Sequence, residues 1–75
     1  MDFNELLKSK GLTQSGILMD LKTRFNCKKT QTTLSRYFNG VIIPNIQVVY
    51  YLSQIIGIDC KELIIGLLEN RNWEF

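Results

Sequence analysis

The 75-residue chain contains no histidine, and this absence excludes much of the chemistry that small proteins perform. Its two cysteines, Cys27 and Cys60, lie far apart and form no CxxC pair, so the sequence offers no tetrahedral zinc set. Without histidine no acid–base or nucleophile–base pair can be nominated, and no glycine-rich loop is suited to cradle a phosphate. We therefore expect no enzyme, no metal and no cofactor, and see no sign of a small-molecule effector.

Long apolar runs are also missing. No stretch approaches the roughly 20 residues that a membrane-spanning helix needs, because glycines and charges interrupt the apolar segments. The first residues, Met1 to Glu5, are acidic and unlike a signal peptide. We expect a cytoplasmic protein that does not associate with membranes, in which both cysteines are free thiols.

Apolar residues make up 45% of the chain and charged residues 21%, a balance typical of one small folded domain over residues 1–75. The charges are unevenly distributed. Residues 1–40 hold seven basic and three acidic side chains, a net charge of +4, whereas residues 41–75 hold two basic and four acidic ones, a net charge of −2. The basic half could meet an anion, although chance clustering on a solvated surface explains the distribution equally well.

Capping residues and the spacing of apolar side chains predict five helices and no strand. Polar residues suited to accept hydrogen bonds from free backbone N–H groups precede each apolar segment, and Gly or Asn-Gly follows most of them. The expected helices begin after Asp2, Thr13, Thr30, Asn45 and Asp59, and end near Lys10, Phe25, Phe38, Ile56 and Asn70.

Two helices joined by a turn, the second carrying small polar residues, describe a helix-turn-helix DNA reader. If Leu34, Tyr37 and Phe38 face the core, the opposite face of the third helix carries side chains suited to base edges. Glutamine pairs with adenine, arginine with guanine, and the threonine methyl group with thymine. A polar face exposed to solvent explains the same pattern equally well. The base-reading candidates are Gln31, Thr32, Ser35 and Arg36.

At these residues the sequence resembles the lambda-repressor-like (Cro-type, XRE) helix-turn-helix family, over roughly residues 3–65. The resemblance implies a compact all-α, five-helix domain whose reading helix is about 31–38. It also implies that Gln31 and Thr32 read bases and that Gln14 and Asn39 contact phosphates. The matching segments are Gly11-Leu12-Thr13-Gln14, Thr30 to Gly40, Pro44-Asn45-Ile46, Leu52 with Ile56-Gly57-Ile58, and Asp59 to Ile64.

One feature departs from the family pattern. Between Gln14 and Thr30 the chain is roughly six residues longer than a compact helix-turn-helix would need, which predicts a lengthened second helix and turn. This places Lys28 and Lys29 near the DNA backbone, where, with Thr30 and Thr33, they complete the expected phosphate contacts. Residues 30–36 are also similar to the reading helix of arginine-repressor winged domains, but the helical continuation after residue 40 argues against that family.

The last two expected helices, with the tail at about 45–75, carry more apolar residues than one core needs. With Ile46, Val49, Tyr50, Leu52 and Ile56 pointing inward, a second apolar stripe remains. We expect this surplus to form a homodimer surface on a near-palindromic site, or else to be covered by the chain's own tail. The expected interface residues are Val48, Tyr51, Ile55, Ile65, Leu67, Leu68 and Trp73.

The functional expectation is a small phage or bacterial repressor that binds double-stranded DNA in the major groove. The alternative is a protein-interaction module, such as an antirepressor or antitoxin, that binds another regulator through the apolar surplus. RNA binding is less favoured, because no aromatic stacking surface stands out among the basic residues.

Overall fold

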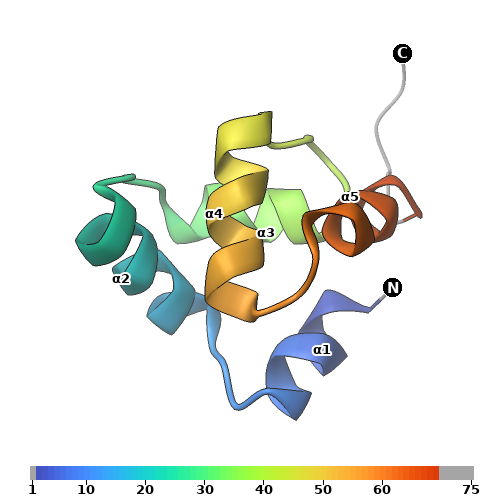
Figure 1. Cartoon of the computed structure of the whole chain (residues 1–75), viewed down its shortest axis with the longest axis horizontal. Coiled ribbons are helices and arrows are strands. Elements are labelled where there is room, and N and C mark those ends of the chain that lie inside the picture. The colour runs from blue at the N-terminus through green and yellow to red at the C-terminus, as the bar shows by residue number, and fades with distance from the viewer. Residues whose placement is uncertain (1, 70–75) are drawn as a thin grey trace.

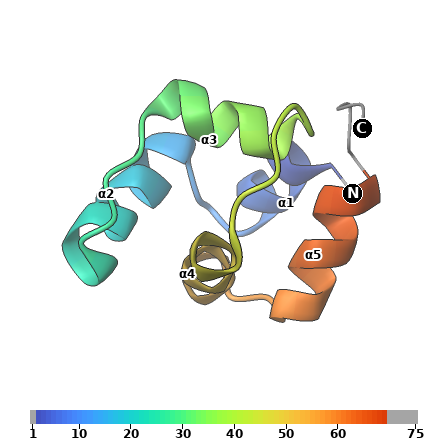
Figure 2. The ribbon, with the colours of Figure 1, turned by 90° about the horizontal axis from the view of Figure 1, so that it is seen from above.

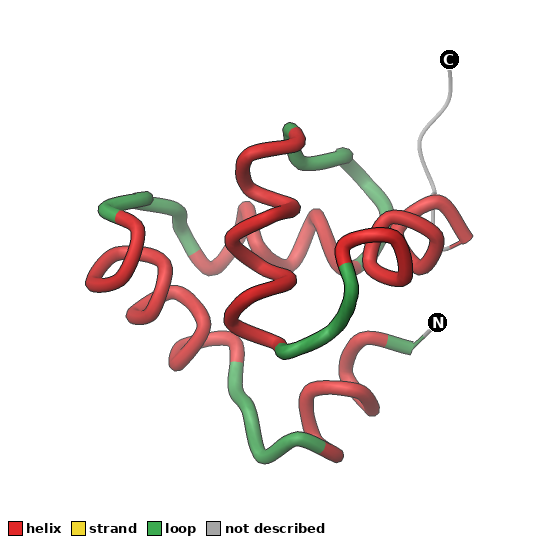
Figure 3. The backbone as a smooth tube through the Cα atoms, in the orientation of Figure 1, coloured by secondary structure: helices red, strands yellow, loops and turns green. Residues whose placement is uncertain are grey.

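The computed structural model describes residues 2–69, and within this range the chain is all-α, as the sequence predicts (Figure 3). The helix boundaries lie within a residue or so of the expected ones. No helix in the described range is long and apolar enough to cross a membrane. The five helices are α1 (Phe3–Ser9), α2 (Gln14–Phe25), α3 (Gln31–Phe38), α4 (Ile46–Ile56) and α5 (Cys60–Glu69).

Helix α4 occupies the centre of the molecule, with α2 on one side and α5 on the other (Figure 1). Helix α3 lies across another side of α4 and packs against α2, and α1 closes the end of the molecule near α3 and α5 (Figure 2). Each of α2 and α3 has one side packed against the interior. Because the two helices also pack against each other, their solvent-exposed sides lie next to each other on the surface.

Local hydrogen bonds determine where the helices begin. The side chain of Asp2 accepts from the backbone N–H groups of Asn4 and Glu5, and Thr13 accepts from Gly16 in the same way. Thr30 and Asn45 cap α3 and α4 through equivalent bonds. Each cap satisfies a backbone donor that has no partner inside the helix.

All five helices contribute fully buried side chains to one core. Phe3 of α1 stacks on Phe38 of α3, with ring centroids 5.0 Å apart. This contact holds the C-terminal end of α3 against the body of the protein. The largest fully buried apolar side chains are Phe3, Ile17, Leu21, Leu34, Leu52 and Leu63.

The expected second stripe on α4 is wrong. Val48 and Ile55 are only 3% and 9% exposed and belong to the core, so they present almost no surface to another chain. Tyr51 is half-buried because its ring stacks on Phe25 of α2, with centroids 4.3 Å apart. Conversely Ile46, expected inside, is 81% exposed.

The physical reason is that α4 touches helices on several sides, so its buried face is turned relative to the expected one. Ser53 contributes to the difference, because this polar residue is 1% exposed and lies inside. Its hydroxyl donates to the carbonyl oxygen of Tyr50 and lies 2.9 Å from the sulfur of Cys60, so burial leaves it satisfied.

On α5, one more residue predicted to lie at the dimer interface is buried instead. Leu67 is 3% exposed and lies in the core, whereas Ile65 and Leu68 are exposed as expected. Trp73, the last of the predicted interface residues, lies outside the described residues. Of the seven side chains proposed for the dimer surface, three are therefore core residues: Val48, Ile55 and Leu67.

Candidate nucleic-acid interface

Helix α3 presents a polar face because its apolar residues anchor it to the core. Leu34 is fully buried, and Tyr37 and Phe38 are nearly so. These three positions lie on one side of the helix, as expected from their spacing. Gln31, Thr32 and Arg36 are consequently exposed to solvent, and Ser35 is half-buried.

The polar face of α3 and the first residue of α2 together line an open hollow of about 370 Å³. Its five lining residues are Gln14, Gln31, Thr32, Ser35 and Arg36. The first turns of α2 and α3 contain no acidic residue, so the partial positive charge of each helix N-terminus is not neutralised there. The hollow is thus rich in hydrogen-bond donors and suited to an anionic or polar partner.

Side chains of α3 and of the residues that cap it are hydrogen-bonded to one another near the hollow. The Thr30 hydroxyl accepts from the backbone N–H of Thr33 at 3.1 Å, and the two threonine hydroxyls lie 3.0 Å apart. At the other end of the helix, the amide of Asn39 donates to the Ser35 hydroxyl at 3.2 Å. Thr30 therefore holds the N-terminus of α3 in shape, and Asn39 orients Ser35.

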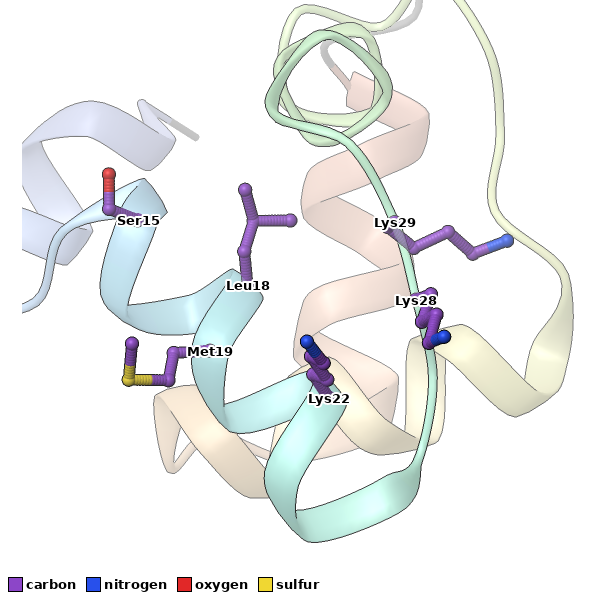
Figure 4. A pocket seen from close by; sticks show the side chains of 6 residues that line it. All are labelled: Ser15, Leu18, Met19, Lys22, Lys28 and Lys29. Carbon is purple, nitrogen blue, oxygen red and sulfur yellow. The ribbon is translucent and has the colours of Figure 1, made fainter.

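A second hollow, of about 410 Å³, lies between α2 and the connection that leads to α3 (Figure 4). In Figure 4, Ser15, Leu18, Met19 and Lys22 project from α2 on one side, and Lys28 and Lys29 come from the connection on the other. Three of the six lining residues are lysines and none is acidic, so this part of the surface is positively charged. In Figure 4 the side chain of Lys29 extends from the connection away from α2.

Four residues of this lysine-lined hollow are not among the site residues that the sequence predicts: Ser15, Leu18, Met19 and Lys22, all of α2. Ser15 and Lys22 are seven residues apart. Residues at that separation lie on the same face of a helix, so the helical period alone predicts that these two side chains share one face of α2. What the sequence does not show is that the connection folds back against that face.

The structure thus brings Gln14 together with all four base-reading candidates, and places Lys28 and Lys29 together in the second hollow. Thr30 and Thr33 lie at the first turn of α3, whereas Asn39 lies beyond its last turn. Among the described residues no group of three or more histidine, cysteine or carboxylate side chains could hold a metal ion. Cys27 and Cys60 are free thiols.

No protein-family model, no curated protein and no solved structure matches the chain. Membership of the lambda-repressor-like family therefore stays a prediction from the sequence. The functional interpretation depends on the geometry of the two hollows and on the chemistry of their side chains.

Proposed function

We propose that the chain is a sequence-specific DNA-binding transcriptional regulator that inserts α3 into the major groove. The observation that carries the proposal is that Gln14, Gln31, Thr32, Ser35 and Arg36 line the same open hollow. A helix that is anchored on one side and exposes amide, hydroxyl and guanidinium groups on the other has the groups that read base edges.

Each polar side chain on this face of α3 is suited to a particular DNA base. The Gln31 amide can donate to and accept from one adenine, and the Arg36 guanidinium can make two hydrogen bonds to one guanine. Thr32 offers a methyl group to thymine. Ser35, held by Asn39, is the fourth base-reading candidate, and its hydroxyl can still donate.

Phosphate contacts would position the helix without reading sequence. Gln14 lies at the N-terminus of α2, where free backbone N–H groups favour an anion. Lys28 and Lys29 of the second hollow, joined by Lys22, would neutralise phosphates beside the groove. Thr30, Thr33 and Asn39 would add contacts at the two ends of α3, where Thr30 and Thr33 also form the cap.

The proposed regulator acts as two copies on a near-palindromic operator, with the reading helices about 34 Å apart. Occupying a promoter in this way would block polymerase, which is how a small phage or bacterial repressor in the cytoplasm would act. The family resemblance and the basic N-terminal half of the chain support this proposal.

Selection of bound fragments from a pool of random duplexes tests the proposal. We expect enrichment of one short sequence, in which adenine and guanine occur at positions compatible with Gln31 and Arg36. A selection that yields no preferred sequence, even at low salt, would contradict sequence-specific reading. Repeating the selection with Gln31→Ala should remove the preference at one position of each half-site and leave the others.

A protein-interaction module, such as an antirepressor or antitoxin, is the second candidate function. The observation that favours it is the set of exposed apolar side chains on α4 and on the connection before it, including Ile43 and Ile46. The two candidates use different faces, because the polar hollow plays no part in an apolar contact. Mapping which face responds to DNA therefore separates them.

A further inference from the structure

Phe25 of α2 and Tyr51 of α4 form the closest aromatic pair in the part of the chain that the structure describes. Their ring centroids are 4.3 Å apart and their planes differ by 14°, so the rings lie nearly face to face. The Arg24 guanidinium lies over the Phe25 ring, 5.3 Å from its centroid, and the Gln47 amide donates to the Tyr51 hydroxyl at 2.8 Å. These contacts favour one arrangement of the two rings, which we call the Phe25–Tyr51 stack.

The stack lies at the point where the chain leaves α2 (Figure 1). Phe25 is the last residue of the helix, and Asn26 after it adopts a left-handed conformation with a φ of 52°, which asparagine tolerates better than most residues. The Asn26 N–H donates to the carbonyl of Lys22 at 3.1 Å, and the Cys27 N–H donates to that of Leu21 at 2.9 Å. These bonds fix the path of the backbone as it leaves the helix.

The connection that follows carries two of the lysines assigned to phosphate contact. Lys28 and Lys29 line the lysine-lined hollow from this side. The connection has no helical or strand structure of its own, so its position depends on how its two ends are held. The Phe25–Tyr51 stack holds one end against α4, and the Thr30 cap of α3 holds the other.

We propose that Phe25 and Tyr51 are positioning residues for DNA binding, whose stack holds the connection in place so that Lys28 and Lys29 are presented to phosphates before DNA binds. The inference rests on the proposed function and adds to it the means by which these phosphate contacts are set in place. A connection that is already ordered adds no ordering cost when DNA binds. Tyr51 acts through the backbone of the connection and makes no contact with DNA itself.

A double-mutant cycle on duplex binding at low salt tests the inference. We expect Tyr51→Leu, which removes the ring stacked on Phe25, to weaken binding by roughly three- to tenfold, the usual cost of ordering a segment on binding. In the background of Lys28→Gln and Lys29→Gln the same change should have almost no effect, because the contacts that it positions are already lost. Equal losses in both backgrounds would overturn the inference, since a general loss of folding would act in both.

Tyr51→Phe and Tyr50→Leu are the matched controls. Tyr51→Phe keeps the stacked ring and removes only the hydroxyl that accepts from Gln47, so this variant should retain most of the duplex affinity. Tyr50 is 51% exposed and meets the Tyr51 ring edge-on, with centroids 6.2 Å apart, so Tyr50→Leu should leave duplex affinity unchanged. A control variant that loses as much affinity as Tyr51→Leu would contradict the role of the stack.

Amide hydrogen exchange on the free chain separates this inference from the proposed function, because it needs no DNA. We expect exchange of the Asn26 and Cys27 amides to accelerate in Tyr51→Leu, since the turn that they close would open more often. The Leu12 amide, which donates to the carbonyl of Leu7 after α1, is the internal reference and should accelerate much less. Uniform acceleration would overturn the inference. Selective acceleration in a chain that binds no duplex would contradict the proposed function, and would still show that the stack holds the connection.

Discussion

Gln31 is the residue on which sequence reading depends most, because its amide is exposed at the first turn of α3 and faces the hollow shared with Gln14. We expect Gln31→Ala to weaken binding to the selected duplex by about 1–3 kcal/mol, the usual value of a two-bond contact to a base. Binding to unrelated duplexes should not change, since phosphate contacts supply it.

Fluorescence anisotropy with both duplexes measures this difference. Gln54→Ala is the control, because Gln54 is an exposed glutamine on α4, outside both hollows. Equal reductions in affinity for the selected and unrelated duplexes would show that Gln31 does not read sequence.

Thr30 has a different role at the residue scale, since its hydroxyl caps α3. We expect Thr30→Ala to lower the free energy of unfolding by about 1 kcal/mol, the usual effect of removing a helix cap. Urea titration measures the change. Thr23→Ala is the control: Thr23 is exposed inside α2, its hydroxyl only donates to the carbonyl of Met19, and removing it should change stability by less than about 0.5 kcal/mol. Similar effects from both substitutions would contradict the capping role.

At the scale of single helices, the sequence predicts where a helix begins and ends better than it predicts which face of the helix is buried. The start of α3 could be predicted because Thr30 and Thr33 interact locally, three residues apart. The buried face of α4 could not, because eight of its eleven residues are apolar and Ser53 is buried. Only the positions of α2 and α5 decide which apolar residues of such a helix lie inside, and those positions are a property of the whole fold.

The orientation of α4 can be checked by mutation. We expect Ile55→Ala to lower the free energy of unfolding by about 2–5 kcal/mol, because it leaves a cavity beside α4. Gln54→Ala, at the neighbouring exposed position, should change it by less than about 0.5 kcal/mol. Thermal or urea unfolding followed by circular dichroism distinguishes the two. A small effect of Ile55→Ala would mean that the buried face of α4 is wrongly placed.

At the scale of the whole molecule, charge controls how strongly DNA binding depends on salt. Lys22, Lys28 and Lys29 line one hollow between α2 and the connection that leads to the reading helix. We expect the triple change of these lysines to glutamine to reduce the slope of log affinity against log salt, by up to about 0.9 for each phosphate that is no longer neutralised. Base preference should be retained, since phosphate contacts carry no sequence information.

A matched triple variant keeps the change in net charge equal. Lys8, Lys10 and Lys61 are exposed and lie in or next to α1 and α5, away from both hollows. Their replacement by glutamine should affect the slope much less. Equal slopes for the two triple variants would show that net charge alone, rather than the lysine-lined hollow, attracts the DNA.

The part of the candidate site that lies on one continuous segment could be predicted from the sequence. The part that combines segments brought together by folding could not. The face containing Gln31, Thr32, Ser35 and Arg36 follows from the period of one helix. The lysine-lined hollow joins α2 to a connection whose path is not encoded in any local pattern. The sequence predicts an apolar surface, but it does not distinguish that surface from the core residues Val48, Ile55 and Leu67.

The central claim is that the polar face of α3 contacts base edges in the major groove. An NMR titration of the isotopically labelled chain with the selected duplex tests it most directly. We expect the largest shifts at the side-chain amide of Gln31 and at the residues of its hollow, with smaller shifts at Lys22, Lys28 and Lys29. Shifts confined to α4 and α5, with the Gln31 amide unmoved at saturation, would contradict the claim.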